Sequence, residues 1–173
     1  SIRADIMAVR DRDPACGTLT NAFLYFKGFQ ALQTYRVANA LWTKDSKRVL
    51  AHYLQSQMSQ KFQIDIHPNA TLGRGIMFDH GTGIRIGGTS HLGHNCSVLH
   101  HVTLGGARGQ KGQIDRHPKV GNGVLLGAGA TIMGPVTIGD GCQVGAGGLV
   151  QEMDLPPRSV AVGVPVKIIG SFV

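Results

Sequence analysis

The stretch VGNGVLLGAGATIMGPVTIGDGCQVGAGGLV, residues 120–150, places an aliphatic residue at every sixth position. The repeated residues are Val120, Leu126, Ile132, Ile138, Val144 and Val150. A short period of this kind is the sequence mark of a parallel β-helix, in which successive coils stack and bury the repeated residues. Glycine follows most of these residues and permits the corners of positive φ that a three-sided coil needs.

The same period extends back toward the N-terminus, with two interruptions. Its earlier members are Ile66, Leu72, Phe78 and Ile84, followed by Ile86, Leu92, Val98 and Leu104. The period slips by two residues at Ile84/Ile86, and a long loop, residues 105–118, precedes Val120. Because three hexads make a coil of about 18 residues, roughly four to five coils are expected. Function in such a stiff solenoid is expected where the period is interrupted.

The composition changes between residues 60 and 72. Of the 25 glycines, only Gly17 and Gly28 precede residue 73. We therefore expect an α+β fold, with an N-terminal helical segment over residues 1–64 and a parallel β-helix of hexapeptide repeats over residues 65–173, interrupted by one extended loop.

The helical segment shows two helical patterns. Apolar residues recur every three or four positions over residues 24–42, which predicts a first helix with Thr18 or Thr20 as its N-cap. Asp45 or Ser46 is a suitable N-cap for a second helix. This second helix is expected to pack on the first helix or on the open end of the solenoid through one apolar stripe, made of Leu50, Leu54, Met58 and Phe62.

The overall composition is that of a folded soluble protein of 173 residues, 42% of them hydrophobic. No run of about 18 apolar residues is present, and the N-terminus lacks the order of a signal peptide, so we expect a cytoplasmic protein without a membrane partner. The net charge of +7 suits a small phosphate-rich ligand. No basic run interleaved with aromatics appears, so nucleic acid is not expected as a partner. The three widely spaced cysteines are expected to be reduced and buried.

The slip in the period carries a candidate catalytic group. Asp79 and His80 precede residues 81–83, where the hexad gains two residues and the chain must bulge. Asp65 lies about one coil earlier, so its carboxylate is expected to approach the His80 imidazole. A carboxylate that orients a histidine stabilises its protonated form, as a general base acting on an alcohol requires. From spacing alone, it is equally plausible that Asp79 and His80 are solvated surface residues without a function.

The long loop carries the second candidate site. It is glycine-rich and basic, and it ends in Asp115, Arg116, His117 and Pro118, where the proline fixes the last turn. An arginine beside a histidine can hold a carboxylate, the arginine through a bidentate fork. An exposed loop without a ligand is the alternative interpretation.

The other histidines allow a weaker alternative, a zinc site. The spacing of His91, His94 and Cys96 is compatible with metal ligands, and His100 with His101 adds further nitrogens. On the hexad count, however, His80 and His100 occupy equivalent positions. We therefore expect them to stack on neighbouring coils.

Several motifs that the hexad does not require occur together. They are RDPA from Arg12, KGFQALQ from Lys27, DIHP from Asp65, GRGIMFDH from Gly73, VTLGG from Val102, DRHPK from Asp115, GAG at both Gly127 and Gly145, and GVP from Gly163. In this order and spacing the chain closely resembles the serine acetyltransferases of the hexapeptide-repeat acyltransferase family over nearly its whole length.

The resemblance implies a left-handed β-helix, a cyclic homotrimer with sites in the clefts between subunits, and no metal. It implies transfer of an acetyl group from acetyl-CoA, the co-substrate, to the hydroxyl of L-serine, which gives O-acetyl-L-serine for cysteine biosynthesis. L-Cysteine is implied as a feedback inhibitor that occupies the serine site.

The resemblance also implies roles for individual residues. His80 would be the general base and Asp65 its orienting partner. The substrate ammonium would be held by Asp13 and Asp79, and the substrate carboxylate by Arg116 and His117. The acetyl-CoA groove would be formed by the backbone around Gly105, Gly106, Ala128 and Ala146, with Lys167 placed to meet a phosphate. A backbone N–H of the Gly105–Gly106 turn is a candidate donor to the oxyanion that develops from the thioester.

This chain departs from the family pattern at three places. Gly87, Gly88 and Thr89 replace the common G-E-T, and the loop before DRHPK is about two residues longer than expected. Family members also carry a larger N-terminal helical domain that pairs trimers, and often a C-terminal tail ending in Ile that docks in cysteine synthase. With about 64 helical residues and an end at Val173, a dimer of trimers is only an alternative, and the cysteine synthase complex is not expected.

Three other functions remain open at the level of sequence. The first is the same chemistry on another acceptor, such as homoserine, a sugar or an antibiotic hydroxyl, of which a sugar would give Arg116 no carboxylate to bind. The second is a zinc lyase of the carbonic anhydrase type. The third is a trimeric scaffold without activity.

Overall fold

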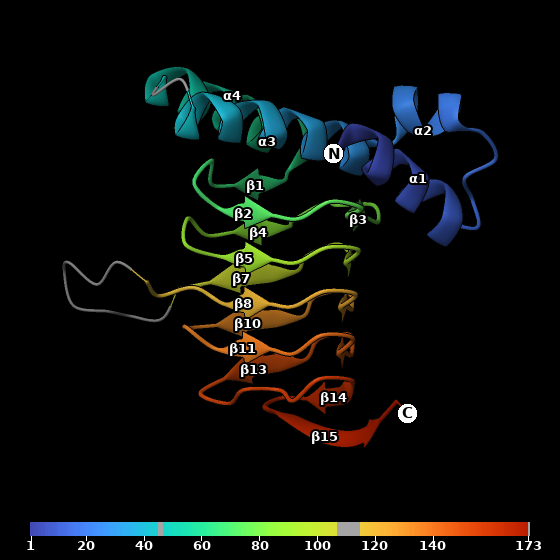
Figure 1. The fold of residues 1–173 in the computed structure, drawn as a ribbon, viewed down its shortest axis with the longest axis vertical. Helices are drawn as coiled ribbons and strands as arrows, with labels where there is room; N and C mark the ends of the chain where they lie inside the picture. The colour runs from blue at the N-terminus through green and yellow to red at the C-terminus, as the bar shows by residue number, and fades with distance from the viewer. Residues whose placement is uncertain (45–46, 107–114, 173) are drawn as a thin grey trace.

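The computed structural model describes residues 1–44, 47–106 and 115–172 (Figure 1). Four helices lie across one end of a three-sided parallel β-helix of about four turns, at the top of the view. The helices are α1 (Ile2–Arg12), α2 (Leu19–Tyr25), α3 (Lys27–Thr43) and α4 (Arg48–Phe62). In the described residues, no helix is both long and apolar enough to cross a membrane.

Short strands form the three sides of the solenoid. The β1 sheet contains β1 (Asp65–Ile66), β4 (Arg85–Ile86), β7 (Thr103–Gly105), β10 (Thr131–Met133) and β13 (Leu149–Gln151). The β2 sheet contains β2 (Thr71–Leu72), β5 (His91–Leu92), β8 (Lys119–Val120) and β11 (Thr137–Ile138). The β3 sheet contains β3 (Met77–Phe78), β6 (Ser97–Val98), β9 (Leu125–Leu126), β12 (Gln143–Val144), β14 (Ser159–Gly163) and the antiparallel β15 (Val166–Ser171).

The hexad predicted from the sequence is confirmed residue by residue. Every repeated residue from Ile66 to Val150 is at most 9% exposed, and all of them belong to one continuous core. The register also continues across both interruptions, since Ile66 pairs with Ile86 and Leu104 with Ile132. Both interruptions therefore leave the strand pairing intact.

Two corners of the solenoid carry most of the candidate functional residues. We call the turns that lead from the β3 sheet to the β1 sheet (residues 79–84, 99–102, 127–130 and 145–148) the histidine corner. We call the turns that lead from the β1 sheet to the β2 sheet, including residues 87–90 and the described ends of the long loop, the arginine corner.

The helical layer closes the open end of the core, as expected for the second helix. Leu32 and Tyr35 of α3 and Met58 of α4 are buried in the same core as the solenoid residues. The Tyr35 hydroxyl donates a hydrogen bond to the carbonyl of Ala70, 2.5 Å away, and burial raises the pKa of Tyr35 to about 12. The helical layer and the solenoid therefore share one core, and the helices hold the first coil in place.

The first predicted helix is in fact two helices. Thr18 caps α2 by accepting a hydrogen bond from the Asn21 N–H at 3.1 Å, but the chain leaves helical geometry at Phe26 before α3 begins. Immediately after this break α3 meets the solenoid at Gly28, where a Cβ atom would lie 2.2 Å from the Phe78 carbonyl oxygen. Only glycine allows this close approach.

The predicted stripe on α4 is wrong at its first member. Leu50 is 46% exposed, and Ala51 is buried in its place, whereas Met58 and Phe62 contact the core as expected. The predicted N-caps Asp45 and Ser46 lie outside the described residues.

The three cysteines are free thiols, as expected from their spacing. Cys96 and Cys142 are buried and Cys16 is half-buried, which corrects the expectation of burial for Cys16. Burial raises the pKa of Cys96 to about 11, so this thiol stays protonated at neutral pH.

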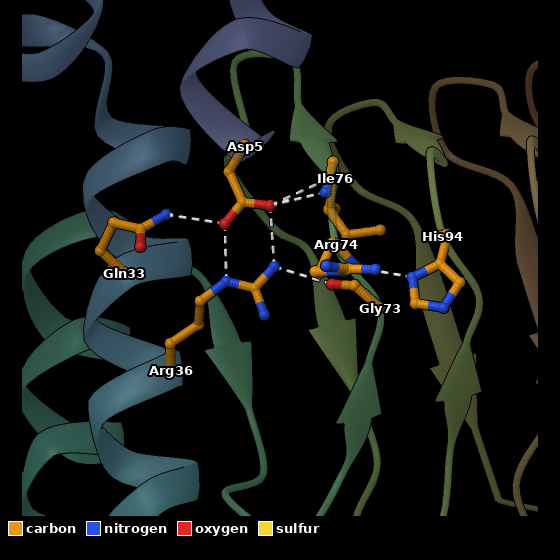
Figure 2. A network of polar contacts seen from close by, with 8 residues as sticks. Asp5, Gln33, Arg36, Gly73, Arg74, Ile76 and His94 are labelled. Carbon is orange, nitrogen blue, oxygen red and sulfur yellow. Dashed lines mark hydrogen bonds and ion pairs between the residues drawn. The ribbon is translucent and has the colours of Figure 1, made fainter. Parts of the chain in front are cut away.

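A buried carboxylate joins α1 to α3 and to the solenoid (Figure 2). Asp5 is fully buried and accepts hydrogen bonds from both the Nε and Nη2 atoms of Arg36, at 2.6 and 2.8 Å, and from Gln33 at 3.1 Å. The backbone N–H groups of Gly75 and Ile76 also donate to its Oδ1 atom, at 2.9 and 3.2 Å. We call this set of contacts around Asp5 the Asp5 clamp. The clamp ties α1 to the residues directly before β3.

Replacement of Asp5 by Ala is expected to lower the free energy of unfolding by about 3–5 kcal/mol, because it leaves the Arg36 charge without its buried partner. Urea unfolding measures this loss. Asp11→Ala on the same helix is the control: Asp11 pairs with Arg10 at the surface, so a loss under about 1 kcal/mol is expected. Equal losses in the two variants would contradict the role of the clamp.

Candidate active site

The turn that follows β3 presents His80 at the histidine corner. His80 adopts a left-handed backbone conformation with φ of 57°, and the glycines at 81 and 83 have φ of 75° and 76°. The Gly81 N–H donates to the Asp79 carbonyl at 2.6 Å, which closes the turn. The two residues gained at the slip therefore form a tight bulge, and the His80 side chain is 75% exposed on it.

His80 shares a cavity with two of the predicted substrate-binding residues. The cavity has a volume of about 540 Å³, and Asp13, Asp79 and His80 all line it. The Asp79 Oδ1 atom lies 3.7 Å from the His80 Nε2 atom. Asp13 directly follows α1, and its Oδ1 atom accepts the Ala15 N–H at 2.8 Å. The cavity is thus lined by an accessible imidazole and two carboxylates.

Lys27 lines this cavity too, although the sequence alone indicated no role for it. It is the first residue of α3 and donates a hydrogen bond from its Nζ atom to the Thr82 hydroxyl. The contact ties the turn that carries His80 to the helical layer. The available signal was the place of Lys27 at the head of the KGFQALQ motif.

At the arginine corner, Thr89 organises the end of the long loop. Its hydroxyl lies 2.7 Å from the Nδ1 atom of His117 and accepts the Arg116 N–H at 3.3 Å. Its carbonyl accepts a hydrogen bond from Lys119, 2.5 Å away, and Lys119 also pairs with Asp115 at 2.7 Å. The sequence alone indicated no role for Thr89. The available signal was its match to the last residue of the G-E-T pattern, of which this segment also keeps the first glycine.

His117 is held as a neutral imidazole. Burial is the main cause that lowers its pKa, and the charges of Arg116 and Lys119 lower it further. The backbone N–H of Thr89 donates to its Nδ1 atom at 3.4 Å, which leaves the proton on Nε2. The predicted pair at the arginine corner therefore consists of one charged and one neutral donor.

Gly87 makes the space for this imidazole. A Cβ atom at Gly87 would lie 2.0 Å from the His117 Nε2 atom, so Gly87→Ala must displace the ring. If Arg116 and His117 bind the carboxylate of a substrate, the KM for that substrate should rise at least about tenfold, the factor that corresponds to about 1.4 kcal/mol of lost binding, with a smaller change in kcat. Steady-state kinetics measure both values. Gly17→Ala, where a Cβ atom meets nothing within 4 Å, is the control, and equal KM values in both variants would refute the steric argument.

Asp65 lies on β1, between the two corners, and lines a cavity on each side. One cavity, of about 870 Å³, also contains Gly83 and His101 of the histidine corner. The other, of about 340 Å³, contains Arg116 and His117 of the arginine corner. Its Oδ1 atom accepts a hydrogen bond from Gln55 at 2.7 Å. Within the described residues it makes no ion pair with His80, whose carboxylate neighbour is Asp79. One chain therefore does not bring Asp65 and His80 together.

The residues predicted to bind acetyl-CoA are divided between the two corners and β15. Gly105 and Gly106 lie at the arginine corner, where a Cβ atom on Gly106 would contact the Arg116 side chain at 3.1 Å. Ala128 and Ala146 lie at the histidine corner on successive coils, linked by the hydrogen bond from the Gly147 N–H to the Ala128 carbonyl at 2.8 Å. Lys167 lies exposed on β15.

The stacking expected for the histidines is confirmed. The rings of His80 and His100 lie on neighbouring coils with their centroids 5.8 Å apart. Across residues 1–44, 47–106 and 115–172, no group of three or more His, Cys, Asp or Glu side chains is arranged to hold a metal ion.

The hexapeptide-repeat solenoid places the chain in the class of bacterial hexapeptide transferases. The family model of the bacterial transferase hexapeptide matches residues 117–150, and that of the serine acetyltransferase N-terminal region matches residues 1–34. The chain belongs to the serine acetyltransferase family.

Individual relatives support this membership. The serine acetyltransferase of Salmonella typhimurium is 49% identical over 170 residues, which cover 98% of this chain and 61% of that protein. The soybean enzyme in complex with serine is 51% identical with a TM-score of 0.92, and the match covers 97% of this chain and 68% of that one. The Brucella abortus enzyme in complex with coenzyme A is 46% identical with a TM-score of 0.94, over 99% and 67% of the two chains. A serine acetyltransferase in complex with cysteine is 46% identical, with a TM-score of 0.92 over 98% and 68%.

The match is complete for this chain but partial for its curated relatives. The chain spans 42% to 61% of the length of the curated serine acetyltransferases named for Arabidopsis thaliana and Salmonella typhimurium. The activity, substrates and partners of those longer proteins are therefore proposals for this chain.

Proposed function

We propose that the protein transfers an acetyl group from acetyl-CoA to the hydroxyl of L-serine and releases O-acetyl-L-serine and coenzyme A, a step toward cysteine. The observation that carries the proposal is the common cavity of His80, Asp13 and Asp79 in a chain of this family. Relatives solved with serine and with coenzyme A support the choice of both substrates.

In the proposed mechanism the neutral His80 imidazole takes the hydroxyl proton while the serine oxygen attacks the thioester carbon. The new ester C–O bond forms, the C–S bond breaks, and the proton passes from the imidazolium to the departing thiolate. General-base assistance of this kind contributes about 10²–10⁴-fold to the rate. A backbone N–H of the Gly105–Gly106 turn would stabilise the oxyanion, and Ala128, Ala146 and Lys167 would line the path of the coenzyme.

Charge complementarity explains the choice of an amino acid as acceptor. The Asp13 and Asp79 carboxylates would hold the substrate ammonium, and Arg116 with the neutral His117 would hold its carboxylate. Both ends of a zwitterion are therefore bound by groups of opposite charge or by hydrogen-bond donors. A sugar or an antibiotic alcohol would leave the arginine without its partner.

Asp79 and His80 lie at the histidine corner, whereas Arg116 and His117 lie at the arginine corner. This separation within one chain supports a site that is shared between neighbouring subunits. We propose a homotrimer in which the arginine corner of one subunit faces the histidine corner of the next, so that Asp65 reaches the His80 imidazole across the interface. Closed cyclic symmetry then builds three identical sites. A dimer of trimers is the alternative assembly, and the cytoplasm is the proposed compartment.

L-Cysteine is the proposed inhibitor of this site. It carries the same ammonium and carboxylate as serine, and a relative has been solved with cysteine bound. Inhibition should be competitive with serine. An unchanged rate at subsaturating serine would remove cysteine from the proposal.

The direct test is coenzyme A release from acetyl-CoA with L-serine, L-homoserine and no acceptor in parallel. Release with serine alone supports the proposed function. Release with another acceptor would keep His80 as the base but reassign the pocket, and no release with any acceptor would favour a scaffold that has lost activity. Sedimentation at micromolar concentration tests the assembly, and a single chain there would contradict the shared site.

A further inference from the structure

The amide of Gln55 connects the helical layer to Asp65. Gln55 lies on α4 and is half-buried, and its Nε2 atom donates to the Asp65 Oδ1 atom at 2.7 Å. Its Oε1 atom lies 3.2 Å from the Nδ1 atom of His52, one turn earlier on the same helix. Each end of the amide thus has a partner, and the two partners differ in what they require.

These partners fix which way the amide points. A carboxylate only accepts hydrogen bonds, so the NH₂ group must face Asp65 and the amide oxygen must face His52. His52 then carries its proton on Nδ1. Its ring packs edge-on against Trp42 and His67, with centroids 5.1 and 5.6 Å away, so its position is constrained by two neighbours.

The residues around this contact are themselves anchored. The Trp42 indole N–H donates to the Asn69 side-chain oxygen at 2.9 Å, and the Asn69 N–H donates to the Nδ1 atom of His67 at 3.0 Å. Desolvation is the main cause that lowers the pKa of His67, so this ring remains a neutral acceptor near pH 7. A continuous set of contacts therefore runs from the turn after β1, through α3 and α4, to the carboxylate.

The hydrogen bond from Gln55 leaves one carboxylate oxygen of Asp65 available to accept another hydrogen bond. Among the hydrogen bonds of the described residues, Oδ1 is occupied by Gln55 and Oδ2 has no partner. Asp65 lines the same cavity as Gln55, Arg116 and His117. A carboxylate held at one oxygen presents the other in a fixed direction.

We propose that Gln55 is a positioning residue of the acetyl transfer: it holds Asp65 so that the free carboxylate oxygen meets the imidazole that takes the serine proton. This inference rests on the proposed function, because it assigns Asp65 to the catalytic imidazole. Gln55 touches no substrate in this scheme and acts only through Asp65. A residue that acts in this way should affect kcat and leave substrate binding unchanged.

The test is Gln55→Leu, which keeps the size of the side chain and removes its donor. A hydrogen bond to a charged group contributes about 1.5–3 kcal/mol, so kcat should fall about 10- to 100-fold while both KM values stay within about twofold. Gln57→Leu is the matched control, since Gln57 is exposed on the same helix, and its kcat should equal that of the unaltered protein. Thermal unfolding of both variants checks that α4 is intact.

A double-mutant cycle separates positioning from a structural role. If Gln55 acts through Asp65, then Gln55→Leu in the Asp65→Ala background should lower kcat no further than Asp65→Ala alone. Gln55→Glu adds a second readout: two adjacent carboxylates repel, so its kcat relative to the unaltered protein should recover at lower pH, where a shared proton restores the donor.

Additive losses in the cycle, or a fall in kcat that Gln57→Leu shares, would overturn the proposal. Failure of the proposed function would look different, because the unaltered protein itself would release no coenzyme A with serine. If the unaltered protein is active and Gln55→Leu leaves kcat unchanged, the positioning role is refuted while the proposed function stands.

Discussion

His80→Asn is expected to lower kcat for serine acetylation by about 10²–10⁴-fold, the contribution of a positioned general base. Asparagine is the informative replacement because His80 has a φ of 57°, a conformation that asparagine tolerates better than alanine. The turn after β3 should therefore survive while the base is lost. Coenzyme A release at saturating concentrations of both substrates measures the effect.

Two controls accompany this variant. Its thermal unfolding midpoint should match that of the unaltered protein, because the side chain is 75% exposed and contributes little packing. Its affinity for acetyl-CoA should also be retained. Undiminished turnover by His80→Asn would exclude His80 as the base.

A mixture of two inactive variants is expected to regain activity. His80→Asn removes the base at the histidine corner, and Arg116→Ala removes the carboxylate-binding cation at the arginine corner. If each site combines the two corners of neighbouring subunits, random assembly of equal amounts should restore both groups at about a quarter of the interfaces. The two variants are unfolded together, refolded and assayed at a total concentration equal to that of the unaltered protein.

The controls decide between a shared site and a site within one chain. Each variant is refolded alone, and the two are also mixed without unfolding, where little regain is expected if subunits exchange slowly. Activity near a quarter of the unaltered level only after joint refolding supports the shared site. A regain that never exceeds the sum of the separate variants would place both groups in one chain.

The solenoid could be predicted because its signal is local and repeated. Each hexad residue from Ile66 to Val150 reports the same buried environment, so one misread position has little effect on the whole. The helices repeat less regularly. The break at Phe26 comes directly before the close contact of Gly28 with Phe78, and a contact between segments fifty residues apart leaves no mark in helical periodicity.

The candidate site could be predicted in its residue types but not in its grouping. Asp79 and His80 stood out because they occur at an interruption that the hexad does not require. The partners of Asp65 and His117, which are Gln55 and Thr89, depend on which side chains meet in space. Spacing along the chain predicted that Asp65 lies near His80, whereas within the described residues its hydrogen-bond partner is Gln55 on α4.

The continuity of the strand pairing across both interruptions has a consequence for how such a chain can change. Strand register is kept across each interruption, since Ile66 pairs with Ile86 and Leu104 with Ile132. The segments that would meet substrate are therefore free of the six-residue period that the stack requires. Selection can alter the length and chemistry of these turns, and with them the acceptor, almost independently of selection for stability.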